Sequence, residues 1–141
     1  MPYQIKLHDG HDSLQKLDIY FKNLSEASPP QNPAIVILNP SIIMNLLTKV
    51  GGGFESNQFR YPNLKEALDR VSFFELPIIQ LTHSNKISFV NGRHRTFYMA
   101  SKKIEAVPYL TMNGMVQGLK SLAGTTNATH FDLQNMIYPV I

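Results

Sequence analysis

Ile87–Leu110, ISFVNGRHRTFYMASKKIEAVPYL, is the stretch that decides the fold, because it contains an abrupt change of backbone at an Asn-Gly pair. Ile87–Val90 is a short, mostly apolar run typical of a strand. Three residues that carry or can acquire positive charge follow the glycine, and we call Asn91–Arg95 the cationic turn. If a helix begins at Arg93, its first amide groups and the positive end of its dipole meet these side chains. The sequence therefore predicts an anion site, with phosphate as the expected anion.

An Asn-Gly pair between apolar runs is also the strongest short-range signal for a two-residue β-hairpin. A hairpin would make Thr96–Met99 the return strand, but neither alternating set of these residues is cleanly apolar. As a helix, Arg93–Lys103 presents apolar residues on one face and two lysines in its last turn, where the helix dipole favours cations. We therefore expect a helix at this position.

The rest of the chain alternates short strands with helices. Strands are predicted from runs rich in β-branched residues, and helices from apolar residues spaced three and four apart behind a capping residue. Asn39-Pro40 marks a helix start, because Asn is a good N-cap and Pro fits the first helical position. The expected strands are Tyr3–Leu7 at a sheet edge, Ala34–Leu38, Ile78–Leu81, Ile87–Val90 and Val107–Leu110. The expected helices follow a cap at Ser13 or Asp12, occupy Ser41–Val50, follow Asn63, and lie around Met115–Leu122 and Asp132–Ile137.

The composition suits one compact α+β domain over residues 1–141, with a small mixed β-sheet flanked by helices. Within it we expect a core at residues 34–111 and a C-terminal helical extension at 112–141. The net charge of +3 permits contact with nucleic acid but forms no basic tail. The chain has no cysteine, which excludes thiol chemistry and disulfides. No stretch reaches the roughly 18 apolar residues of a membrane span, so we expect a cytoplasmic protein with no membrane partner.

The order of these elements resembles the ParB/sulfiredoxin superfamily. LKEALDRVSFFELPIIQL, at Leu64–Leu81, is followed by a turn and then by the Ile87–Leu110 stretch. Members typically show a helix, a strand begun by proline, a second strand closing in a Gly-x-His/Arg-Arg turn, a helix and a Val-Pro strand. The resemblance covers about Ala34–Thr111. Its most specific element is Gly92-Arg93-His94-Arg95, with Pro108 after the next helix.

In this superfamily the turn holds nucleotide phosphates, which implies a nucleotide- or nucleic-acid-phosphate-binding domain. The resemblance assigns binding to Asn91, Gly92, His94 and Arg95, with Arg93 at the variable position, and implies ATP or another nucleotide with Mg²⁺. Sulfiredoxin chemistry needs a cysteine in the turn, so this chain resembles instead the ParB-like nuclease domain. The compact members include plasmid fertility-inhibition factors, for which ATPase and DNase activities are attributed to the fold.

Hydrolysis also needs an acid or base and a group that orients water. His94 is the first candidate, because histidine side chains in general can exchange a proton near neutral pH, and a helix-capping histidine is the alternative. Glu55 and Arg60, in the aromatic-rich loop Phe54–Tyr61, are the second candidates, as a catalytic acid and a further phosphate-binding cation. The alternative is that both are solvated loop residues. The His/Asp cluster at His8–Asp12 is read as an exposed turn, so no metal ligand is assigned.

The rival function is a non-catalytic DNA- or protein-binding module that uses the same cationic turn. Under both hypotheses Gly92 allows close backbone approach and Arg95 makes a bidentate contact, the alternatives being a simple turn glycine and a surface arginine. Replacing Arg95 by alanine is expected to abolish nucleotide binding while leaving the melting temperature nearly unchanged.

Overall fold

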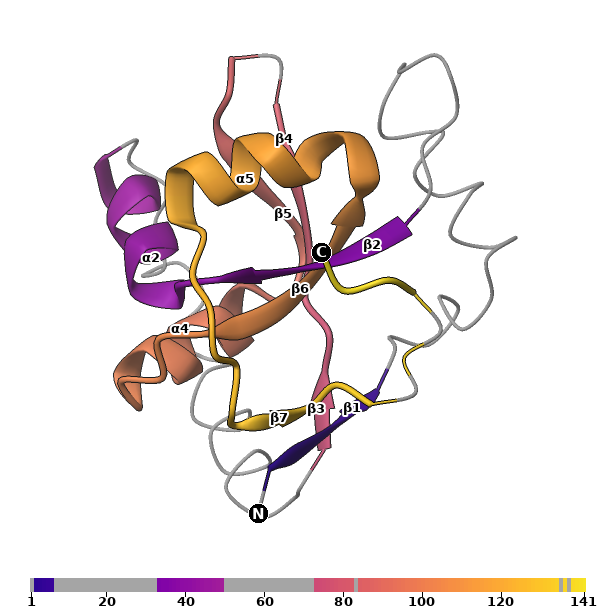
Figure 1. Cartoon of the computed structure of the whole chain (residues 1–141). Coiled ribbons are helices and arrows are strands. Elements are labelled where there is room, and N and C mark those ends of the chain that lie inside the picture. Colours follow the sequence, from indigo (N-terminus) through magenta and orange to yellow (C-terminus); the bar gives the residue numbers. More distant parts are fainter. Residues whose placement is uncertain (1, 7–32, 50–72, 83, 135, 137) are drawn as a thin grey trace.

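A four-stranded mixed sheet lies at the centre of the structure, a computed structural model that describes residues 2–6, 33–49, 73–82, 84–134, 136 and 138–141 (Figure 1). Its strand order is β2-β6-β4-β5, in which β2 pairs antiparallel with β6, β6 parallel with β4, and β4 antiparallel with β5. The strands are β2 (Pro33–Leu38), β4 (Ile78–Leu81), β5 (Ile87–Asn91) and β6 (Val107–Met112).

Three strands form a second, parallel sheet in the order β3-β1-β7. They are β1 (Tyr3–Lys6), β3 (Phe73–Glu75) and β7 (Phe131–Asp132). The prediction that Tyr3–Leu7 lies at a sheet edge is wrong, because β1 pairs with a neighbour on both sides. Only Leu76-Pro77 separates β3 from β4, so one extended segment of chain passes from the small sheet into the central one (Figure 1).

Ring contacts hold the small sheet together. The ring centroids of Tyr3 and Phe131 lie 5.6 Å apart and stacked, and those of Phe74 and Phe131 lie 4.9 Å apart edge to face. The expected helix at Asp132–Ile137 does not form over the described residues of that range, because Phe131 is held in a strand by these contacts. After the strand, the Oδ1 of Asp132 accepts a hydrogen bond from the backbone N of Gln134 at 3.1 Å.

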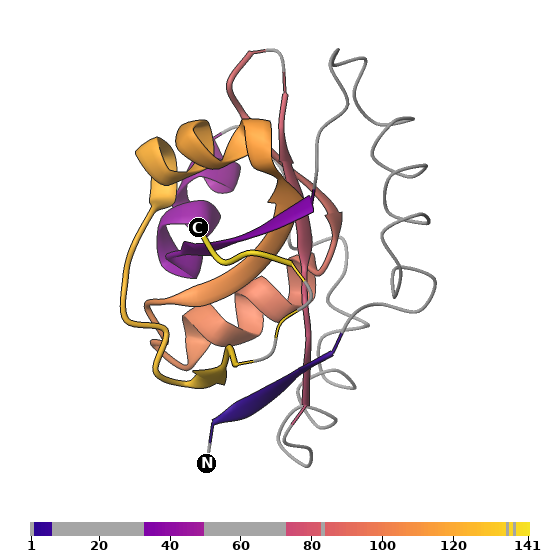
Figure 2. The ribbon, with the colours of Figure 1, turned by 45° about the vertical axis from the view of Figure 1, so that its right-hand side comes forward.

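Three helices, α2 (Pro40–Lys49), α4 (Arg93–Ser101) and α5 (Val116–Ala123), lie together against one face of the central sheet (Figure 2). A 3₁₀ turn, η2 (Asn113–Met115), leads into α5. The start of α2 confirms the predicted cap, because the Oδ1 of Asn39 accepts a hydrogen bond from the backbone N of Ser41 at 2.9 Å.

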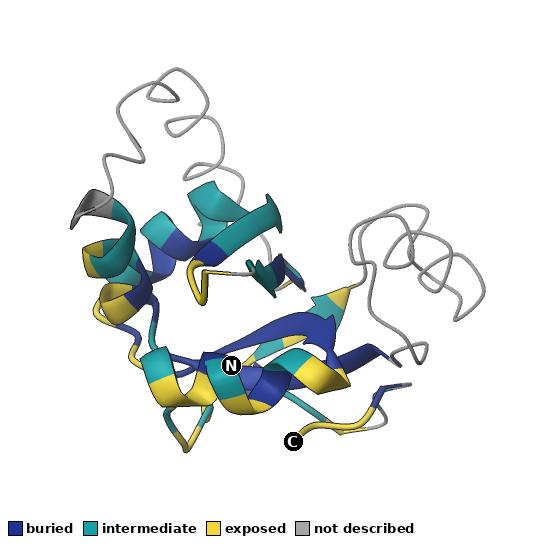
Figure 3. Cartoon of the chain, turned by 90° about the horizontal axis from the view of Figure 1, so that it is seen from above, coloured by how far each residue is buried: buried dark blue, intermediate teal, exposed yellow. Residues whose placement is uncertain are grey.

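Every residue of β2 and β6 is buried (Figure 3), and the alternating side chains of these two strands divide the core into two parts. Val36 and Tyr109 face the helices and pack in one cluster with Met99 of α4. Ile35 and Leu110 face the opposite side and pack with Tyr138 of the C-terminal segment, residues 138–141. Backbone hydrogen bonds join that segment to the free side of β2. The domain is therefore α+β as predicted, and residues after 112 contribute strand pairing as well as a helix.

The predicted strands at Ala34–Leu38, Ile78–Leu81, Ile87–Val90 and Val107–Leu110 are confirmed, with small differences in length. The helices expected after Ser13 and after Asn63 lie outside the described residues. Within the described ranges, no helix is both long and apolar enough to cross a bilayer.

Candidate functional site

The chain passes from strand to helix at Gly92, which confirms the helical interpretation of the Asn-Gly pair and excludes the hairpin. β5 ends at Asn91 and α4 begins at Arg93. Gly92 takes φ 95° and ψ 17°, a left-handed conformation that residues with a β-carbon rarely adopt. The local sequence predicts this change of structure correctly, because a single glycine at positive φ redirects the backbone at the start of the helix.

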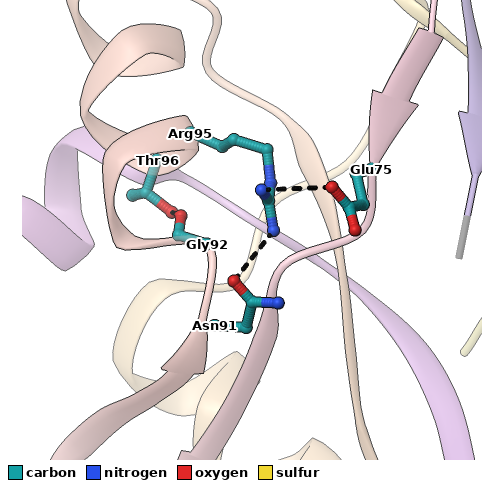
Figure 4. A network of polar contacts seen from close by, with 5 residues as sticks. All are labelled: Glu75, Asn91, Gly92, Arg95 and Thr96. Carbon is teal, nitrogen blue, oxygen red and sulfur yellow. Dashed lines mark hydrogen bonds and ion pairs between the residues drawn. The ribbon is translucent and has the colours of Figure 1, made fainter. Parts of the chain in front are cut away.

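Gly92 also lies against Pro77, the residue just before β4. A β-carbon at Gly92 would meet the Cβ of Pro77, lie 2.6 Å from its Cα and stand 3.1 Å from Nη2 of Arg95. The absence of a side chain therefore serves close packing as well as the backbone angle. The Arg95 head group lies next to the glycine, between the strand-to-helix turn and the β3–β4 segment (Figure 4).

Arg95 reaches back across the first turn of α4 to two partners (Figure 4). Its Nη2 donates to the Oδ1 of Asn91 at 3.3 Å, and its Nη1 donates to the Oε2 of Glu75 at 3.5 Å. Both distances lie at or beyond the long end of the usual range, so neither bond is strong. The Arg95 side chain is only 11% exposed, and burial lowers its pKa while the charge of Glu75 acts in the opposite direction.

Nε, the third nitrogen of the Arg95 guanidinium, is buried and makes no hydrogen bond to any part of the chain that the structure describes. A buried donor without an acceptor costs roughly 1–3 kcal/mol, and native proteins rarely tolerate it without a reason. Within the described residues, the guanidinium is thus held in place by two long bonds, and its Nε has no acceptor.

A buried hydrogen bond fixes the orientation of α4 on the central sheet. The Oγ1 of Thr96 and the hydroxyl of Tyr109 on β6 lie 2.9 Å apart, and Thr96 also donates to the carbonyl of Gly92 at 3.2 Å. Burial raises the pKa of Tyr109 above its usual range, which keeps the hydroxyl neutral. The first turn of α4 is therefore tied both to the preceding glycine and to the sheet.

The first turn of α4 carries two arginines and a histidine, whereas a helix normally favours acidic residues there. It has no acidic residue, and its three residues are Arg93, His94 and Arg95. Positive charge at the positive end of the helix dipole is unfavourable by a few tenths of a kcal/mol or more for each exposed charge. All three side chains are partly buried. The sequence therefore lacks the acidic residues that stabilise a helix N-terminus, and it does so at the position where the anion site is predicted.

The structure brings together the five predicted turn residues, because they are consecutive and the turn is ordered around Gly92. Glu55 and Arg60, together with the clusters at Phe54–Tyr61 and His8–Asp12, lie outside the described residues. Sequence reasoning missed Glu75. It gives no local signal, since it lies 20 positions before Arg95 and only the fold brings β3 beside the start of α4.

The burial of Arg95 changes the effect that we expect Arg95→Ala to have on the melting temperature. A side chain that is 11% exposed and hydrogen-bonded on two sides contributes to packing. Arg95→Ala is therefore expected to lower the melting temperature, and a test of ligand binding needs a variant that keeps the volume of the side chain.

The described residues do not offer a ready magnesium site. Mg²⁺ is usually held by one or two carboxylates together with substrate phosphates. Near the turn the described carboxylate is that of Glu75, which is already paired with Arg95, and the remaining side chains are an amide and three bases. Across the described ranges, no group of three or more His, Asp or Glu residues is placed to hold a metal ion. The turn itself is suited to an anion.

Two hollows of the structure lie away from the turn. One cavity of about 410 Å³ is at the far end of the β4–β5 hairpin, where Leu46, Ile87 and Leu122 form an apolar wall and Lys86 is at the rim. A shallower depression of similar volume lies between α2 and α4. Neither is lined by a described residue of the cationic turn.

Comparisons of the chain with protein-family models, curated proteins and solved structures found no match.

Proposed function

We propose that this chain binds a phosphate group, of a nucleotide or of a nucleic acid, at the cationic turn. The observation that carries the proposal is the state of Arg95. Its side chain is 11% exposed, its guanidinium makes two long hydrogen bonds within the described residues, and its buried Nε has no acceptor there. Arginine forms its strongest contacts with oxyanions that accept two hydrogen bonds at once. A phosphate would supply oxygen acceptors for the Arg95 guanidinium that the described residues do not supply.

The position of the turn supports the same conclusion. α4 begins directly after Gly92, which has no side chain with which to cap the first amides. A helix N-terminus attracts anions through its amide groups and its dipole. The three bases of the first turn reduce helix stability, and departures from local stability rules tend to occur at functional sites. Together these features favour an external anion as the partner of the turn.

We also propose that the chain is a compact relative of the ParB-like nuclease domain, similar to plasmid fertility-inhibition factors. Support comes from the order of elements around the turn: a proline before β4, the strand β5, a left-handed glycine, α4, and β6 with Pro108. This order of elements supports the proposed relationship. For hydrolysis, the turn offers one candidate acid or base, His94.

Binding is tested by titrating ¹⁵N-labelled protein with ATP and following the amide signals of residues 92–96. Arg95→Met keeps much of the side-chain volume and removes the donors, so binding should weaken at least about tenfold because a charge-assisted, bidentate contact is lost. Lys120→Met is the matched control, because Lys120 is an exposed cation on α5. Equal affinities in Arg95→Met and the control would exclude the proposed site.

Catalysis is tested separately, by phosphate release and plasmid nicking with Mg²⁺ or Mn²⁺. An enzyme that uses His94 should lose activity in His94→Ala while still binding ATP. Activity that survives this substitution belongs to another site or to a contaminant. Binding without turnover would favour the alternative, a non-catalytic module that binds DNA or a protein through the same turn.

A further inference from the structure

The cavity of about 410 Å³ lies where α2, α5 and the β4–β5 hairpin meet (Figure 1). It is at the opposite end of β5 from the cationic turn, because Ile87 lines the cavity and Asn91 ends the strand. Small-molecule sites in proteins usually measure about 300–1,000 Å³. The cavity is therefore large enough for a small ligand, and it is separate from the site of the proposed function.

The two sides of this cavity differ in polarity. The helices supply three partly buried leucines, Leu46 and Leu47 from α2 and Leu122 from α5. The start of β5 adds Ile87, which is 8% exposed. The polar residues that line the cavity all belong to the β4–β5 hairpin, at positions 82, 84–86 and 88. A ligand in the cavity therefore meets hydrocarbon on the helix side and polar groups on the hairpin side.

Hydrogen bonds within the hairpin hold its polar side in place. The backbone N of Thr82 donates to the carbonyl of Lys86 at 2.8 Å, and the backbone N of Asn85 donates to the carbonyl of Thr82 at 2.9 Å. The Oγ1 of Thr82 accepts a third bond, from the backbone N of Lys86 at 3.2 Å. A ligand that binds to a backbone already ordered in this way loses little affinity to ordering it.

Lys86 is the one charged residue among the described residues that line the cavity. Its side chain is exposed, and it forms no ion pair with any residue in the described ranges. The same lining contains no acidic residue. A cation beside a wall of leucines is complementary to a molecule with a hydrocarbon body and one anionic end.

We propose that this cavity binds a single-chain carboxylate of the medium-chain fatty acid class. The hydrocarbon chain lies against the leucines of α2 and α5, and the carboxylate lies at Lys86. The volume is near the lower end of the range for small-molecule sites, which favours one short chain over a bulkier ligand. The charge of Lys86 favours the carboxylate over a neutral alcohol of the same length.

The role of the apolar wall is tested with octanoate and hexanoate, each below its micelle concentration. Binding is followed at about pH 7.5, where carboxylates are ionised, through the amide signals of residues 84–88 in ¹⁵N-labelled protein. Octanoate should bind about tenfold more tightly than hexanoate, because each of its two extra methylene groups gains about three- to fourfold when it is buried. Equal affinities, or shifts at residues 92–96 in place of 84–88, would overturn the proposal.

The role of the charge is tested in Lys86→Met, which keeps most of the aliphatic stem. Octanoate should bind about two- to fivefold more weakly, as expected for one exposed ion pair, while octanol keeps its affinity. Lys120→Met is the matched control, because Lys120 is an exposed cation on α5 that does not line the cavity. An equal loss in the control would assign the effect to net charge, and an equal loss for octanol would assign it to the apolar wall. Either result would exclude Lys86 as the carboxylate partner.

The location of the ligand is tested in Leu122→Phe, whose larger ring takes up space in the cavity. Octanoate should bind at least about tenfold more weakly, since several methylene groups lose their place. Unchanged affinity in a variant that melts like wild type would overturn the proposal. If the variant fails to fold, the comparison of octanoate with hexanoate in wild type still decides. Shifts of residues 84–88 that depend on protein concentration without any probe would place a second copy of the chain in the cavity and exclude the fatty acid.

Discussion

Gly92 and Pro77 touch across the start of α4, leaving no room for a β-carbon between them: one built on Gly92 would lie 2.6 Å from the Cα of Pro77. Pro77 stands at the junction between the small sheet and the central sheet, and its carbonyl accepts a hydrogen bond from the backbone N of Leu110 at 2.9 Å. The turn that presents Arg95 is therefore packed directly on the segment that carries Glu75.

Gly92→Ala should destabilise the domain by about 2–4 kcal/mol, because alanine is strained at φ 95° and its methyl group meets the backbone of Pro77. Urea denaturation measures the change. Gly118→Ala on α5 is the control, since the added methyl group would meet only the end of the Leu81 side chain. That variant should stay within about 1 kcal/mol of wild type. Similar costs at the two positions would contradict this account of the turn.

Thr96→Val should cost about 1–3 kcal/mol, because it leaves the buried hydroxyl of Tyr109 without its partner at 2.9 Å. Tyr109→Phe in the same chain removes the unpaired hydroxyl. The double variant should therefore be less destabilised than the sum of the two single variants. Strict additivity in chemical denaturation would show that the two hydroxyls do not act as a pair.

Stability should fall as the pH rises above about 10, the ordinary pKa of tyrosine. Burial raises the pKa of Tyr109 in the folded chain, so the folded state keeps a proton that the unfolded state loses. The contribution is fully present below that pH and declines above it by up to about 1.4 kcal/mol per pH unit. Melting temperatures of wild type and Tyr109→Phe, measured across the alkaline range, test this. The variant should show the shallower decline, and parallel curves would contradict the prediction.

Asn39→Ala should destabilise the domain by about 1 kcal/mol, because the Oδ1 of Asn39 caps the backbone N of Ser41 and, at 3.4 Å, that of Ile42. Asn39→Asp keeps an acceptor at the same place and should retain most of the stability. Thermal denaturation of the three proteins measures the difference. A loss in Asn39→Asp equal to that in Asn39→Ala would mean that the side chain does not act as a cap.

Features that depend on a few consecutive residues were predictable from the sequence. The cap at Asn39, the left-handed glycine before α4 and the strands around the cationic turn all follow from local chemistry: a short side-chain acceptor, a missing β-carbon, and runs of β-branched residues. The same local reasoning placed Asn91–Arg95 together, because the residues are adjacent and the turn keeps them so.

Features that depend on residues distant in sequence were decided only by the tertiary structure. Nothing near Phe131 distinguishes a strand from a helix until its ring meets those of Tyr3 and Phe74. In the same way, local sequence does not distinguish Arg95 from an ordinary surface cation. In the structure, β3 brings Glu75 to within 3.5 Å of Arg95, and the fold buries most of the Arg95 side chain. The sequence by itself determined where the helix starts and which charges stand there. Tertiary packing decided how much of that charge is already neutralised, because ion pairing and desolvation depend on neighbours that local sequence does not specify.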